Sequence, residues 1–66
     1  MVDAVLLEHL RAAVDVDDWV LAADVCLEIS LAANSELDRE RADDLAKAVR
    51  LQDGELVEAI IEALEP

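Results

Sequence analysis

The side chains best suited to chemistry near neutral pH are a single histidine, His9, and a single cysteine, Cys26. A histidine can activate a thiol as a nucleophile, but such catalysis also needs a pocket and fixed donors for the developing charge. Cys26 stands between Val25 and Leu27 in the most apolar part of the chain, where a free cysteine usually behaves as a small hydrophobic residue. We therefore expect a structural Cys26, a surface or boundary His9 and no catalytic residues.

Three acids lie close together at Asp15, Asp17 and Asp18, and the first two have the spacing with which a calcium-binding loop begins. An EF-hand loop then needs a third ligand and a glycine, and Trp19 and Val20 occupy those places. Capping of a following helix by these acids is the better interpretation.

A second acidic series, Glu55, Glu58, Glu62 and Glu65, has helical spacing. Di-metal carboxylate sites combine inward-facing glutamates with a Glu-x-x-His motif, which the sequence lacks. These glutamates also fall opposite an apolar stripe, which is typical of a solvated helix face. We expect neither a metal ion nor a cofactor.

The composition restricts the class of protein further. The chain has 66 residues, 56% of them apolar, and its 17 acidic and five basic residues give a net charge of −12. This length predicts one domain over residues 1–66. The strong negative charge argues against direct binding to nucleic acid or an anionic membrane. Acids near the N-terminus and the lack of a long apolar run predict a soluble cytoplasmic protein with neither signal peptide nor membrane span.

Helix formers dominate the chain, and no segment alternates apolar and polar residues long enough to suggest a strand. Asp, Asn, Ser and Gly mark the breaks. The fold class predicted from these signals is all-α, a small compact bundle of four helices, with no internal repeat. The predicted ranges are 4–13, 18–33, 36–51 and 55–65.

Each predicted helix begins at a residue suited to accept a hydrogen bond from the first turn. Asp3, Asp17 and Ser35 are the predicted N-caps of the first three helices. At the last break two interpretations stay open: Asp53 caps the fourth helix, or Gly54 closes the third.

The helix at 18–33 is apolar over most of its circumference, so we expect it to be central and contacted on several sides. Trp19 opens it either as part of the core or as an interface anchor, and we favour the core. The predicted core comprises Leu6, Leu10, Trp19, Ala22, Val25, Cys26, Ile29, Leu45, Val49, Leu56, Ile60 and Leu64.

So short a domain buries only about 60% of its unfolded surface, which leaves too little interior for all of these apolar residues. Those left exposed would form an interface. Four of the five basic residues lie between 39 and 50, where attraction to an acidic surface is strongest. The candidate interface residues are Leu7, Leu21, Leu31, Arg39, Arg41, Leu51 and Val57.

The segment from Val5 to Leu27 is similar to the start of death-effector-type domains. An apolar first helix precedes a second helix that opens at Asp17-Asp18-Trp19 and contains Cys26-Leu27. The chain is too short for six full helices and lacks the Arg-x-Asp-Leu motif of that family. The resemblance implies no more than a helical interaction domain.

These observations predict a non-enzymatic protein-interaction or self-association module, with another protein or a second copy as partner and no small-molecule substrate. One alternative is an acidic inhibitor or nucleic-acid mimic that occupies a basic groove of its partner. Another is a designed helical protein without biological function, although the free cysteine and the single lysine count against design.

Overall fold

The computed structural model of the chain describes residues 3–64, which form four helices. They are α1 (Ala4–Asp15), α2 (Trp19–Leu31), α3 (Glu36–Arg50) and α4 (Gly54–Leu64). The predicted all-α fold is confirmed, and the helix ends agree with the predicted ones to within two residues. The predicted end of the last helix at residue 65 lies outside the described residues.

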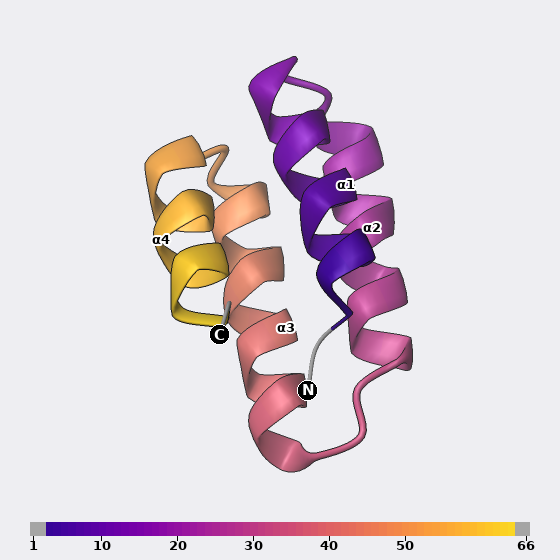
Figure 1. Cartoon of the computed structure of the whole chain (residues 1–66). Coiled ribbons are helices and arrows are strands. Elements are labelled where there is room, and N and C mark those ends of the chain that lie inside the picture. The colour runs from indigo at the N-terminus through magenta and orange to yellow at the C-terminus, as the bar shows by residue number, and fades with distance from the viewer. Residues whose placement is uncertain (1–2, 65–66) are drawn as a thin grey trace.

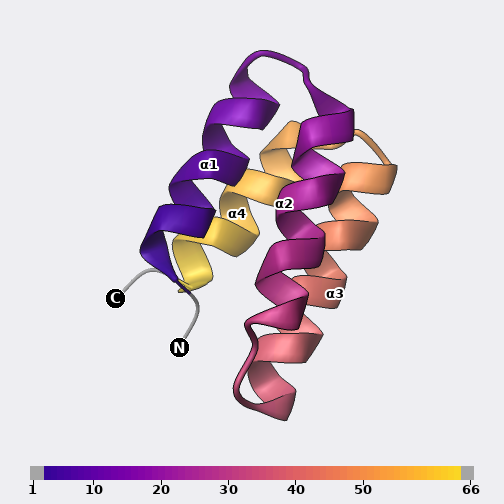
Figure 2. The ribbon, with the colours of Figure 1, turned by 90° about the vertical axis from the view of Figure 1, so that its right-hand side faces the viewer.

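The helices run alternately up and down, so that each lies antiparallel to the next (Figure 1). α4 also packs against α1, which closes the bundle. Seen from the side, α2 lies between α1 and α3 (Figure 2). α2 makes the most extensive contacts of the four, as expected for the central helix, but the helices it contacts are α1 and α3 alone among the described elements.

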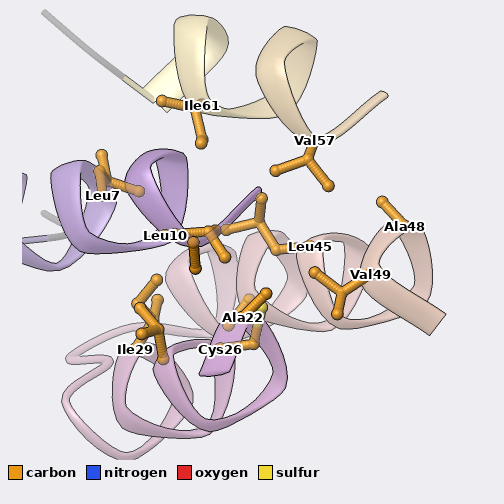
Figure 3. Close-up of a cluster of buried hydrophobic side chains, with 13 residues drawn as sticks. Leu7, Leu10, Ala22, Cys26, Ile29, Leu45, Ala48, Val49, Val57 and Ile61 are labelled. Carbon is orange, nitrogen blue, oxygen red and sulfur yellow. The ribbon is translucent and has the colours of Figure 1, made fainter. Parts of the chain in front are cut away.

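All four helices contribute to one apolar core, which Figure 3 shows in close-up. Leu10, Ile29, Leu45 and Ile61, one from each helix, are almost completely buried. The predicted core residues that are buried are Leu10, Ala22, Val25, Cys26, Ile29, Leu45 and Val49. Those that are partly buried and pack against the core are Leu6, Trp19, Ile60 and Leu64.

Three predicted positions are corrected by the packing. Leu7 and Val57, expected at an interface, are buried, whereas Leu56, expected in the core, is exposed. α1 packs against both α2 and α4, so its buried arc is wide enough to include Leu7 as well as Leu10. In α4 the apolar residues Leu56 and Val57 are adjacent, and one step along a helix is a rotation of about 100°. The two side chains therefore point in different directions, and Val57 is the one that faces the core.

The first and third helices begin as predicted. The carboxylate of Asp3 accepts a hydrogen bond from the Val5 amide at 2.9 Å, and the hydroxyl of Ser35 accepts one from the Asp38 amide at 3.2 Å. Each bond satisfies an amide of the first turn that has no partner within the helix.

The turn between α1 and α2 moves the second cap by one residue. Asp17 has a left-handed backbone with φ of 56°. The Asp17 amide donates to the Val14 carbonyl at 3.0 Å and the Asp18 amide to the Ala13 carbonyl at 2.9 Å, the two bonds of a Schellman motif. Asp18 is therefore the N-cap, and its carboxylate accepts from the Leu21 amide at 3.1 Å. The prediction of Asp17 was wrong because Asp17 closes the preceding helix.

The turn between α3 and α4 repeats this geometry. Gln52 has a φ of 53°, and the Asp53 amide donates to the Ala48 carbonyl at 3.0 Å. The carboxylate of Asp53 accepts from the Leu56 amide at 3.1 Å. Of the two interpretations left open, Asp53 as the cap is confirmed, and Gly54 is the first residue of α4.

A shift of 35 residues aligns these two turns and the helices around them. Six pairs are identical at this shift: Asp3 and Asp38, Leu10 and Leu45, Ala13 and Ala48, Val14 and Val49, Asp18 and Asp53, and Leu21 and Leu56. The pairs Leu7 and Ala42, Ala22 and Val57, and Cys26 and Ile61 are buried in both halves. The two hairpins thus share a turn geometry and a pattern of buried positions.

Candidate interaction surfaces

The structure does not bring the two candidates for neutral-pH chemistry together. His9 is exposed on α1 and lines a groove between α1 and α2, whereas Cys26 is buried and lines a different groove, between α2 and α3. Burial raises the pKa of the Cys26 thiol to about 11, which keeps it protonated and unreactive at neutral pH.

Two of the acidic residues considered above, Asp18 and Glu58, have structural partners. Asp18 caps α2, and Glu58 of α4 forms an ion pair with Arg11 of α1, with 2.7 Å between Oε1 and Nε. Within residues 3–64, no cluster of three or more His, Cys, Asp or Glu side chains is arranged to hold a metal ion. Glu65 lies outside the described residues.

The side of α2 that points away from the core is apolar and uncovered. Val20, Leu27 and Leu31 are 77%, 60% and 78% exposed. We call these three residues, together with the exposed Asp24 between them, the outer face of α2. Its four positions follow each other at steps of four, three and four residues, the spacing of a helix seam that packs against another helix.

A groove separates α1 from α2 on the outside of the first hairpin, and we call it the α1–α2 groove. It has a volume of about 580 Å³. Val16 and Leu21 lie at one end of it, and both remain largely exposed. The lining residues are His9, Ala12, Ala13, Val16, Leu21, Asp24, Val25 and Glu28.

The second hairpin has the equivalent groove, the α3–α4 groove, with a volume of about 400 Å³. It is lined by Asp44, Lys47, Leu51, Leu56 and Ile60. Each of these residues lies 35 positions after a residue that lines the α1–α2 groove. Equivalent residues are also similarly exposed: Val16 and Leu51 are both 73% exposed, and Leu21 and Leu56 are 47% and 41% exposed.

A third, smaller groove of about 310 Å³ runs between α2 and α3. Small residues form much of it, since Ala23 of α2 faces Ala42 and Ala46 of α3. Asp43 and Arg50 lie at its α3 side. Small side chains allow the two helices to approach closely, and this pair of helices packs most extensively.

Positive charge is concentrated away from the first hairpin. Arg39, Arg41, Lys47 and Arg50 all lie on α3 and are exposed, and Nη1 of Arg41 lies 3.8 Å from Oδ2 of Asp44. The fifth basic residue, Arg11, pairs with α4. The α1–α2 groove, by contrast, is lined by the acids Asp24 and Glu28, and its described lining residues include no lysine or arginine.

The predicted interface residues are distributed over several surfaces. Leu21 lies in the α1–α2 groove, Leu51 in the α3–α4 groove, and Leu31 on the outer face of α2. Arg39 and Arg41 are exposed on α3, while Leu7 and Val57 belong to the core. Sequence reasoning missed Val16, Val20 and Leu27, although the apolar circumference of α2 was a signal for the last two.

Comparison with known proteins gives no relative: no protein-family model matches the chain, and no curated protein or solved structure does either. Among the helices of residues 3–64, none combines the length and apolar character needed to cross a bilayer.

Proposed function

We propose that this protein is a non-enzymatic interaction module that binds another protein, or a second copy of itself, through the outer face of α2. The observation that carries this proposal is the exposure of Val20, Leu27 and Leu31, each more than half exposed on the most apolar helix. Soluble monomers rarely leave several large aliphatic side chains exposed along one side of a helix, because covering apolar surface is favourable.

The geometry of this row supports helix-to-helix docking. Val20, Leu27 and Leu31 lie along one side of a regular helix, so a partner helix could contact all three at once. Asp24 interrupts the row, and a polar residue in such a seam restricts which partner fits and in what register.

The net charge of −12 favours a second candidate, an acidic inhibitor or nucleic-acid mimic that binds a basic groove. The two candidates differ in their response to salt. Binding through apolar contacts persists or strengthens when salt screens repulsion between acidic surfaces, whereas binding of a mimic weakens steeply.

The test is the mass of the protein in solution at low and high salt, combined with recovery of bound proteins from a cell extract. Leu27→Asn removes the centre of the outer face, and Val5→Ser, at another exposed apolar residue on α1, is the matched control. We expect a dimer that strengthens with salt, or a bound protein, to be lost in Leu27→Asn and retained in Val5→Ser.

Two outcomes would contradict the proposal. A protein that stays monomeric, and whose bound proteins are the same in both variants, has no interaction through the outer face of α2. Bound basic proteins that are released by salt and indifferent to Leu27→Asn would support the acidic mimic instead.

A further inference from the structure

We propose that the α1–α2 groove binds an amphipathic helix of a partner protein, with aliphatic residues on one face and lysine or arginine beside them. This inference goes beyond the proposed function, because it assigns a second surface and the chemistry of the partner that binds there. It is carried by the shape of the groove, by its charge and by a comparison with the equivalent groove of the second hairpin.

The shape of the groove suits a helix. It lies between two antiparallel helices, and its volume of about 580 Å³ is in the range of ligand-binding clefts. Ala12 and Ala13 line it with small side chains, while Val16, Leu21 and Val25 line it with larger apolar ones. An apolar helix face can therefore lie along the groove with aliphatic side chains over the alanines.

The charge around the groove selects a basic partner. Asp24 and Glu28 line its α2 side, and no lysine or arginine is among the described residues that line it. A helix with lysine or arginine flanking its apolar face would pair with these acids, and the net charge of −12 would accelerate its approach.

A second copy of the chain does not meet these requirements. Its lysine and three of its arginines lie on α3. The apolar residues Ala42, Leu45 and Val49 of this helix are buried in the core, and Leu37 is its single exposed large apolar side chain. α3 therefore cannot offer an apolar face and basic flanks together without unfolding the bundle. Two chains of net charge −12 also repel each other, so a different, basic protein fits the groove better.

The α3–α4 groove provides an internal control because its apolar residues are equivalent but its charge is not. Leu51, Leu56 and Ile60 replace Val16, Leu21 and Val25, while Lys47 stands where the first groove has Ala12. Lys47 offsets the charge of Asp44, so this groove lacks the net negative charge that a basic helix would require.

The experiment is an NMR titration of the full chain with synthetic amphipathic peptides of about five helical turns. One peptide carries leucines at helical spacing and lysines elsewhere, and a second has glutamate in place of lysine. A third has the lysine composition but contains central prolines that prevent helix formation. We expect the lysine peptide to bind at least about tenfold more tightly than either of the others. The shifted amide signals should centre on His9, Val16 and Leu21.

Paired variants then locate the site. Leu21→Asn should raise the Kd of the lysine peptide by about tenfold or more, and Leu56→Asn, at the equivalent exposed position, by less than about twofold. The double variant Asp24→Lys with Glu28→Lys reverses the charge of the groove, so it should bind the glutamate peptide more tightly than the lysine peptide. Circular dichroism checks that each variant keeps its helices.

The outcomes separate this inference from the proposed function. Equal effects of Leu21→Asn and Leu56→Asn, or equal binding of the proline peptide, would overturn the groove as a helix-binding site. Shifts centred on Val20, Leu27 and Leu31 would also overturn it, while supporting the outer face of α2. Binding in the groove with an inert outer face would overturn the proposed function and leave this inference standing.

Discussion

Cys26 illustrates how one buried side chain makes stability depend on pH. Burial raises the pKa of its thiol from 9.0 to about 11. The folded state therefore holds its proton more tightly than the unfolded state, and this contribution to stability is complete below pH 9.0. As the pH rises from there to about 11, the unfolded state loses the proton first, so the free energy of unfolding falls.

We expect urea unfolding to show this fall over that alkaline range, amounting to at most about 3 kcal/mol from the thiol. Cys26→Ala removes the titrating group and should flatten the pH dependence, although it also lowers stability at neutral pH by leaving a small cavity. Parallel pH profiles for the two proteins would show that Cys26 does not titrate in this way.

Asp17 and Asp18 are adjacent and chemically identical, yet the structure gives them different roles. Asp18→Ala removes the hydrogen bond to the Leu21 amide and should lower the free energy of unfolding by about 1 kcal/mol. Asp17→Asn should change it by less than about 0.5 kcal/mol, because asparagine tolerates the left-handed backbone at that position. Chemical denaturation of both variants measures the difference, and the reverse order would assign the cap to Asp17.

At the level of the elements, local signals predicted the helices well. Caps such as Asp3 and Ser35 mark helix starts through short-range chemistry that a sequence displays directly. The order of Asp17 and Asp18 could not be predicted, since it depends on whether the preceding helix ends in a Schellman motif. The facing of α4 also required the structure, because Leu56 and Val57 are both apolar and only tertiary packing selects between them.

Gln52 is the weakest point in the turn between α3 and α4, because a residue with a side chain pays a steric cost at a φ of 53°. Gln52→Gly relieves this cost and should raise the free energy of unfolding by up to about 1 kcal/mol, or Tm by several degrees. Gln52→Ala is the control, since alanine keeps the steric cost and should give no gain. A loss of stability in the glycine variant would mean that the Gln52 side chain makes a stabilising contact.

At the scale of the whole molecule, the two hairpins have similar buried positions but different surface charges, and only the structure shows this correspondence. Equivalent positions such as His9 and Asp44, or Ala12 and Lys47, differ in charge while the buried positions keep their apolar character. Sequence identity between the hairpins is therefore low, and their similarity is visible in burial and turn geometry. The exposed face of α2 could not be predicted from the sequence either, because a helix that is apolar over most of its circumference gives no signal for the side that its neighbours leave uncovered.

The excess of acid over this small bundle should make its stability depend strongly on salt. Seventeen acidic and five basic residues share one short domain, so repulsion within the folded chain is larger than in an extended one. Salt screens these charges, and at 0.15 M the Debye length is only about 8 Å, so the repulsion weakens.

We expect the free energy of unfolding, measured with urea, to increase between about 0.02 and about 0.5 M NaCl. The double variant Glu55→Gln with Glu62→Gln removes two exposed charges from α4 and should show a smaller increase. Stability that falls with salt would instead mean that attractive pairs such as Arg11 with Glu58 outweigh the repulsion.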